Sequence, residues 1–122
     1  MNILIADDSP LLRERIKLLL NGFENVSVVG EAENGAEALQ LIRETNPDLA
    51  IVDIRMPEMN GIELLKKIRS ECSRTKVCIL TNFPYKQYRQ RCMAEGADFF
   101  FDKNNDIEQL TKVIATLSGG KE

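Results

Sequence analysis

The chain contains no histidine. Catalysis by histidine and metal ligation by histidine are therefore excluded. Its cysteines, Cys72, Cys78 and Cys92, form an odd set without a C-x-x-C pair, and we interpret them as reduced packing cysteines of a cytoplasmic protein. No apolar run approaches the ~20 residues of a membrane span. Met1 is followed by polar Asn2 and a short apolar run, which is not the pattern of a signal peptide.

The sequence also lacks an excess of positive charge. It has 16 Lys and Arg against 19 Asp and Glu, a formal net charge of -3 and a pI of about 5.1. We therefore expect no direct nucleic-acid binding by this domain, and no membrane partner. The length of 122 residues, with 43% hydrophobic and 29% charged residues, is typical of one globular domain, so we take residues 1–122 as a single domain.

Short apolar runs alternate with helical patterns along the chain. The runs are rich in Ile, Val or Phe and bounded by turn residues, which predicts strands. They are Asn2–Ala6, Val26–Ala32, Leu49–Val52, Lys76–Leu80 and Asp98–Phe101. Each run is followed by a helical pattern, and the pattern after the third run places Leu65, Ile68 and Cys72 on one face. Five such units predict an α/β domain, a doubly wound five-stranded parallel sheet with helices on both faces.

Capping residues support these boundaries. Ser9 followed by Pro10 predicts the start of the first helix. Two pairs with capping-box spacing predict the starts of the second and fifth helices, namely Asn34 with Glu37 and Asn105 with Glu108. Gly22 and Gly96 follow helical segments and suit left-handed residues past a helix end, while Pro84 is expected to open the fourth helix.

Polar residues stand where four of the predicted strands end. The first strand ends in Asp7-Asp8, the third in Asp53, the fourth in Thr81, and the fifth in Asp102-Lys103. Ligands of open α/β sheets bind beyond the carboxyl ends of the strands, so these side chains are expected to converge. Each has a plainer alternative: the acidic pair as helix-start residues, Asp53 in a turn, Thr81 as a strand-end residue and Lys103 as a solvated lysine.

Several carboxylates at one edge need a counter-charge. Two like charges ~4 Å apart repel by about 4 kcal/mol at an effective dielectric constant of ~20. Lys103 supplies one positive charge, and a hard divalent cation with oxygen ligands, Mg²⁺, would supply the rest. Such an arrangement suits a phosphoryl group, toward which a carboxylate is a nucleophile.

These residues carry a resemblance that covers essentially the whole chain. The block Asp53-Ile54-Arg55-Met56-Pro57-Glu58-Met59-Asn60-Gly61 fits the pattern Asp-x-x-Met-Pro-x-Met-x-Gly. With Asp7-Asp8, Thr81 and Gly96-Ala97-Asp98 leading to Lys103, the sequence resembles the receiver domain of two-component response regulators. The resemblance implies a flavodoxin-like (βα)5 fold and a phosphorylation switch that is not a turnover enzyme, although it catalyses its own phosphorylation and dephosphorylation.

The resemblance also implies roles for single residues. Asp53 would be the phosphoacceptor, supplied by a phosphohistidine on a sensor histidine kinase or a histidine phosphotransfer protein. Asp8, Asp53 and the backbone carbonyl of Arg55 would bind Mg²⁺, with Asp7 acting through a water molecule. The phosphoryl-binding and switch residues would be Lys103, Thr81, Asn82 and Phe100, and the change would reach the face of the fourth helix and fifth strand. The output is an unknown output domain or effector protein, and a phosphorylation-linked homodimer is a further partner to consider.

Departures from the commonest family pattern leave some points open. Asn104 replaces the proline that often follows the lysine, so the Lys103–Asn104 peptide is either trans or a strained cis bond. Asn82 stands where Ala or Gly is usual, and Phe100 is either the switch aromatic or a core residue. Two rival functions fit the sequence less well. A haloacid-dehalogenase-type phosphatase needs Asp-x-Asp on the first strand, and a flavodoxin-like cofactor module needs a less acidic rim.

Overall fold

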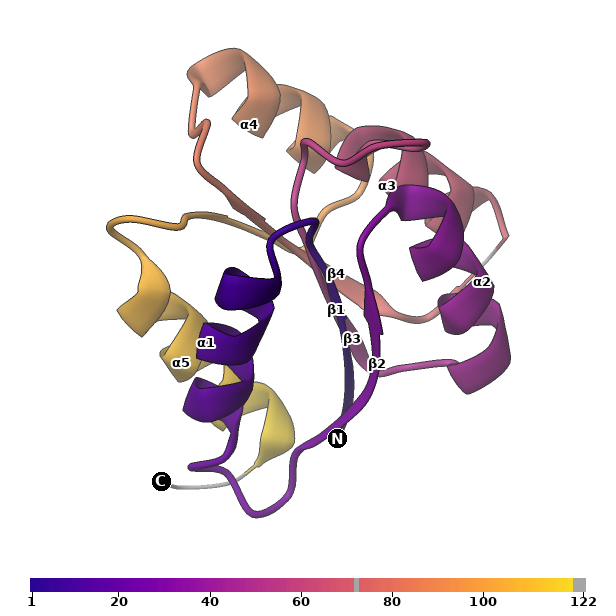
Figure 1. Cartoon of the computed structure of the whole chain (residues 1–122). Helices are drawn as coiled ribbons and strands as arrows, with labels where there is room; N and C mark the ends of the chain where they lie inside the picture. The colour runs from indigo at the N-terminus through magenta and orange to yellow at the C-terminus, as the bar shows by residue number, and fades with distance from the viewer. Residues whose placement is uncertain (72, 120–122) are drawn as a thin grey trace.

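The computed structural model describes residues 1–71 and 73–119. Five strands and five helices alternate along the chain (Figure 1). The strands are β1 Asn2–Ala6, β2 Ser27–Ala32, β3 Leu49–Val52, β4 Lys76–Thr81 and β5 Phe99–Asp102. The helices are α1 Pro10–Leu20, α2 Gly35–Thr45, α3 Gly61–Ser70, α4 Lys86–Ala94 and α5 Ile107–Ser118. No helix in the described part of the chain is long and apolar enough to cross a membrane.

All strand pairs are parallel, and the strand order is β2-β1-β3-β4-β5. The order reverses direction after β1, so the crossover helices cover opposite faces of the sheet. In Figure 1, α1 and α5 lie on one side, with α2 and α3 on the other. The predicted doubly wound five-stranded parallel sheet is therefore confirmed.

Each face of the sheet has its own hydrophobic core because side chains alternate along a strand. On β1, Ile3 and Ile5 pack with the buried residues of α1 and α5. Leu4 and Ala6 point the other way and pack with residues of α2 and α3 and with Cys92 of α4. Every residue of β3 is buried, as expected for a central strand covered on both sides.

The predicted ends of some elements shift by one or two residues. Compared with the sequence-based ranges, β2 starts one residue later and β4 extends to Thr81, while β5 is displaced by one residue. The fourth helix begins at Lys86 rather than at Pro84, with Tyr85 as its N-cap. Pro84 therefore lies in the loop between β4 and α4, where its ring fixes the φ angle two residues before the helix.

Two of the three N-cap predictions are right and one is wrong. The Ser9 side chain accepts from the Leu12 amide at 3.2 Å, and the Asn34 side chain accepts from the Glu37 amide at 2.7 Å. At α5, however, Asp106 is the N-cap, because Asn105 donates its side-chain amide to Asp102 instead.

The glycine predictions divide in the same way. Gly96 has a φ of 101° and ends α4 in the left-handed region, as predicted. Gly22 does not have a positive φ; α1 ends at Leu20, and its C-cap Asn21 is right-handed with a φ of -61°. Cys78 and Cys92 are buried free thiols, in agreement with their interpretation as packing residues. Cys72 lies outside the described residues.

Candidate phosphoryl-transfer site

The backbone of the sheet holds the candidate residues just past the strand ends. The Asp7 amide donates to the Ala32 carbonyl, and the Asp53 amide donates to the Ala6 carbonyl, both at 2.9 Å. The Lys103 amide donates to the Thr81 carbonyl at 2.9 Å. These bonds continue the ladders of the parallel sheet, so the positions of the side chains follow from the strand register.

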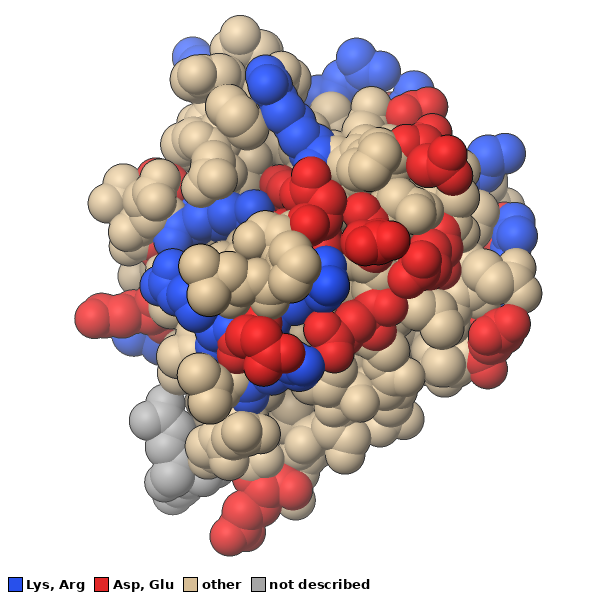
Figure 2. Space-filling view, in the orientation of Figure 1, with Lys and Arg blue, Asp and Glu red and all other residues tan. Residues whose placement is uncertain are grey.

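Three carboxylates gather at this edge. Asp7 and Asp53 are buried, with 3% and 6% of their surface exposed, while Asp8 is exposed. One carboxylate oxygen from each of the three lies within 4.8 Å of the others. Figure 2 shows a group of acidic side chains in the middle of this face, in the region between α1 and α3 of Figure 1, with other acids scattered around the rim.

A buried lysine stands between two of these acids. The Lys103 ammonium lies 2.7 Å from Asp7 Oδ2 and 3.2 Å from Asp53 Oδ2. The lysine is only 9% exposed, so the alternative of a solvated lysine is wrong. Asp7 is fixed further by the Ser9 amide, which donates to its Oδ1 at 2.8 Å. The one ammonium group must therefore balance two buried carboxylates.

Burial raises the pKa of Asp53 from its ordinary value of 3.8 to about 6. Lys103 opposes this rise, the carboxylate of Asp7 adds to it, and the Ile54 amide lowers the pKa slightly through a hydrogen bond. The ionised form of Asp53 is thus disfavoured in the fold, and a further cation near it would stabilise the charge.

The donor set fits Mg²⁺. The ion prefers oxygen ligands, usually one or two carboxylates supplemented by water, and the cluster offers three carboxylates of which one faces solvent. Asp8 and Arg55 line a groove of about 570 Å³ together with Tyr88, so water has access beside the cluster. The residues present can therefore hold the ion that the sequence predicts.

Thr81 and Phe100 are both buried, but Thr81 bonds to the loop after β4 whereas Phe100 packs in the hydrophobic core. Thr81 is fully buried, and its Oγ1 accepts from the Phe83 amide at 2.9 Å. Phe100 is 4% exposed and pairs with Ile79, two residues before Thr81. In this structure Phe100 therefore occupies a core position. Its ring packs in the hydrophobic core between the sheet and helices α2, α3 and α4.

The loops around the cluster hold the remaining candidates. Arg55 is exposed in the β3–α3 loop, and its Cζ lies 3.9 Å above the centroid of the Phe83 ring. Asn82 is exposed and lines a pocket of about 200 Å³ with Lys103 and Asn104. The peptide between Lys103 and Asn104 is trans, since none of the described residues has a cis bond.

The sequence analysis named Asn60 and Gly61 only as part of the motif and missed the structural roles by which they shape the site. Asn60 and Glu63 form a complete capping box at the start of α3, with bonds of 2.9 and 3.1 Å. Their Asn-x-x-Glu spacing was the signal that could have revealed it. Gly61 packs so closely on the phosphoacceptor candidate that a Cβ there would meet the Asp53 carbonyl oxygen at 2.2 Å.

Replacing Gly61 by alanine is therefore expected to destabilise the domain by about 1–3 kcal/mol, because backbone must move to admit the methyl group. Urea denaturation would measure the change. Gly22→Ala is the matched control, since a Cβ there meets its nearest neighbour at 3.6 Å, an ordinary contact. Equal midpoints for the two variants would contradict the expectation.

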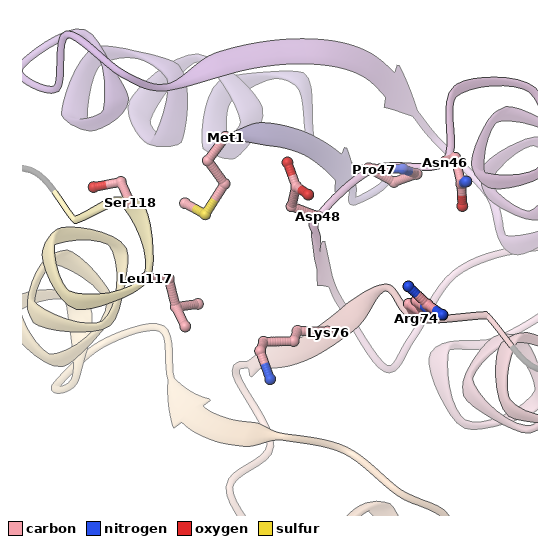
Figure 3. A pocket seen from close by; sticks show the side chains of 8 residues that line it. All are labelled: Met1, Asn46, Pro47, Asp48, Arg74, Lys76, Leu117 and Ser118. Carbon is pink, nitrogen blue, oxygen red and sulfur yellow. The ribbon is translucent and has the colours of Figure 1, made fainter.

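A second large cavity lies at the opposite end of the strands, where β1, β3 and β4 begin. It has a volume of about 540 Å³ and is lined by the start of β1, the α2–β3 loop, the approach to β4 and the end of α5 (Figure 3). Its charged residues are Asp48, Arg74 and Lys76, and none of the acids of the cluster lines it. This cavity is therefore separate from the acidic cluster.

Comparisons with known proteins agree with this geometry. A sequence model described as the response regulator receiver domain matches residues 3–115. A Pseudomonas aeruginosa protein, named as a suspected transcriptional regulator, is 41% identical over 118 residues, which cover 97% of this chain and 56% of that protein. The nitrate/nitrite response regulator protein NarL of Escherichia coli is 32% identical over 119 residues, or 98% of this chain and 55% of that protein.

A solved structure gives the same assignment. The signal receiver domain of a NarL response regulator from Mycobacterium tuberculosis has a TM-score of 0.89 and 32% identity, with 98% of this chain and 97% of that chain covered. The chain spans about half the length of the curated relatives it matches. Domains of this kind are signalling modules of two-component systems rather than turnover enzymes. On its sequence and its structure alike, the chain belongs to the response regulator receiver domain family.

Proposed function

We propose that this domain is a phosphorylation-dependent switch in which Asp53 is the phosphoacceptor. An Asp53 carboxylate oxygen attacks the phosphorus of a phosphohistidine on a sensor histidine kinase or a histidine phosphotransfer protein. The new P–O bond forms as the N–P bond breaks, and the imidazole leaves with the bonding electrons and takes up a proton. The observation that supports this best is the convergence of Asp7, Asp8 and Asp53 within 4.8 Å, beside Lys103.

Mg²⁺ is the proposed cofactor. Asp8, Asp53 and the Arg55 backbone carbonyl are its proposed ligands, with Asp7 acting through a water molecule. When bound, the ion would neutralise charge on the carboxylates and on the phosphoryl oxygens. Lys103 then binds phosphoryl oxygens from the buried side, a role that its position between Asp7 and Asp53 supports.

The signal is proposed to leave the site through β4 and β5. The Thr81 hydroxyl and the Asn82 side chain bind a phosphoryl oxygen, and Thr81 in doing so gives up its bond from the Phe83 amide. Phe100 responds through packing alone, since its ring has no hydroxyl group. The α4 and β5 face is the surface that changes, and α4 is suited to this because it buries little besides Cys92.

The output follows from the relatives by analogy. Names such as transcriptional regulator and nitrate/nitrite response regulator suggest an output in gene regulation, delivered by an output domain or by a separate effector protein. We assign residues 1–122 to the receiver domain as one unit, with no nucleic-acid or membrane contact of its own. A phosphorylation-linked homodimer and a cytoplasmic location are further parts of the proposal.

The proposed function is tested by phosphorylation with a small donor. We expect acetyl phosphate with Mg²⁺ to add one phosphoryl group, and mass spectrometry of peptides to place it on Asp53. Asp53→Asn should remove the labelling, whereas Asp102→Asn, which alters a strand-end acid outside the cluster, should retain it. An adduct on Asp7 or Asp8, or undiminished labelling of Asp53→Asn, would refute the assignment.

Mg²⁺ is expected to stabilise the unphosphorylated domain, because it relieves the repulsion within the acidic cluster. At a hundredfold excess over its dissociation constant the gain is about 2.7 kcal/mol. Asp8→Asn should weaken this response while raising the melting temperature without metal, since one repelling charge is gone. Thermal melts in EDTA and in Mg²⁺ measure both effects, and a wild-type melting temperature that Mg²⁺ leaves unmoved would contradict the metal site.

A further inference from the structure

A cation–π contact between Arg55 and Phe83 joins two loops that flank the site. Arg55 comes from the β3–α3 loop and Phe83 from the β4–α4 loop, and the guanidinium carbon lies 3.9 Å above the ring centroid. Phe83 is also held through its backbone, since its amide donates to Thr81 Oγ1 at 2.9 Å. The β4–α4 loop is therefore held at Phe83 by two contacts, one with Arg55 and one with Thr81.

Aromatic contacts continue from this point into α4. The Phe83 and Tyr85 ring centroids lie 6.1 Å apart, and those of Tyr85 and Tyr88 lie 5.8 Å apart. Tyr85 is the N-cap of α4 and makes no side-chain capping bond, so its side chain is positioned by ring contacts rather than by a polar cap. The first turn of α4 is thus tied to Phe83 by packing.

The guanidinium has a route to the acidic cluster. Arg55 and Asp8 line the same groove of about 570 Å³, and a carboxylate oxygen of Asp8 lies within 4.8 Å of one on Asp53. A phosphoryl group on Asp53 would carry two negative charges close to that groove. Charge-assisted hydrogen bonds from arginine to phosphate are stronger than a partly exposed contact with an aromatic face, so the guanidinium would exchange one partner for the other.

We propose that Arg55 and Phe83 form a latch that holds the β4–α4 loop in the unphosphorylated domain and opens when Asp53 carries a phosphoryl group. This inference rests on the proposed function. The phosphoryl group draws away the Arg55 guanidinium and the Thr81 hydroxyl together, so Phe83 loses both of its anchors at once. The rings of Tyr85 and Tyr88 then lose their fixed neighbour, and the first turn of α4 is free to shift. Arg55 acts here as a positioning residue for the loop and as a ligand of the phosphoryl oxygens.

The chain supplies its own probe for this latch. It contains two tyrosines and no tryptophan. Both tyrosines belong to the ring series that starts at Phe83. Tyrosine fluorescence and the tyrosine bands of near-ultraviolet circular dichroism therefore report on this region without interference from tryptophan.

The experiment uses beryllofluoride with Mg²⁺ as the phosphoryl mimic on the full chain. Tyrosine signals and the melting temperature are followed in the same titration. For the wild type we expect both to change with the same midpoint.

Phe83→Leu should bind beryllofluoride about threefold more tightly, since the guanidinium no longer leaves a ring to reach the anion. Arg55→Gln should bind it more weakly and lose most of the tyrosine response, while Arg91→Gln, which changes an exposed arginine on α4, should match the wild type.

The outcomes separate the latch from the function on which it rests. A rise in melting temperature without a tyrosine response would overturn the latch and leave the phosphoryl site standing. The same holds if Phe83→Leu binds the mimic no more tightly than the wild type does. No effect of beryllofluoride on either signal would overturn both proposals.

Discussion

Replacing Lys103 by methionine is expected to lower the melting temperature of the metal-free domain by roughly 10 °C or more at pH 7.5. The ammonium lies 2.7 Å from Asp7 Oδ2 and 3.2 Å from Asp53 Oδ2, and all three side chains are buried. Removing one partner of a buried ion pair leaves uncompensated charge and typically costs about 3–5 kcal/mol. For a domain of this size each kcal/mol shifts the melting temperature by several degrees.

The cost should depend on pH through Asp53. In the wild type its pKa is raised from 3.8 to about 6 by burial, so the folded state binds a proton more readily than the unfolded state does. The stability from that proton is fully present below pH 3.8 and is lost as pH rises through about 6. In Lys103→Met the pKa of Asp53 should rise further, because the ammonium that lowers it is gone. Near pH 5 the variant therefore carries a neutral Asp53, and its deficit relative to the wild type should shrink.

Thermal melts in EDTA at pH 5 and pH 7.5 provide the measurement. Lys112→Met, which removes an exposed lysine of α5, is the control and should leave the melting temperature nearly unchanged. The double variant Lys103→Met, Asp53→Asn should recover much of the loss at pH 7.5, because it removes one of the stranded charges. A deficit that is the same at both pH values, or that the second substitution fails to reduce, would contradict the electrostatic explanation.

The sheet and the candidate site were predictable because both follow from strand register. Five apolar runs with helical patterns between them determine a parallel sheet, and the residues after such strands must meet at one edge. The structure brings Asp7, Asp8, Asp53 and Lys103 together there. The roles of these residues stay predictions, since they concern bound groups rather than the fold.

The errors arose where a local signal had competing partners. Asn105 has the spacing of a cap, but its side chain bonds to Asp102 and leaves the N-cap position to Asp106. Gly22 can adopt a left-handed conformation without being required to, whereas Gly96 does adopt one. Side-chain contacts between loops are harder to predict from sequence, because the spacing of Arg55 and Phe83 does not indicate that they are in contact. Their contact depends on the paths of two loops that the sequence pattern does not determine.

The same two residues bear on the lifetime of the phosphorylated state, which we expect to be long. Hydrolysis needs a water molecule in line with the bond between the Asp53 oxygen and phosphorus. The resemblance to receiver domains implies that two side chains would flank that approach. They are the second residue after the phosphoacceptor and the second after the switch threonine, here Arg55 and Phe83. Neither carries a carboxylate or amide oxygen that could accept a hydrogen bond from the attacking water, so neither can orient that water for attack.

The double variant Arg55→Asn, Phe83→Glu is therefore expected to lose its phosphoryl group about tenfold faster than the wild type. The amide and the carboxylate would orient water, and a tenfold change in rate needs only about 1.4 kcal/mol of barrier. The decay of the phosphorylated protein, followed by intact mass after removal of the donor, is the measurement. Arg91→Asn is the control for an exposed arginine outside the groove and should decay at the wild-type rate.

Asn82, exposed beside Lys103, is the side chain that could itself hold a water molecule, and Asn82→Ala in the same assay tests it. If the double variant decays no faster than the wild type while Asn82→Ala decays more slowly, then Asn82 controls the water and the flanking pair does not.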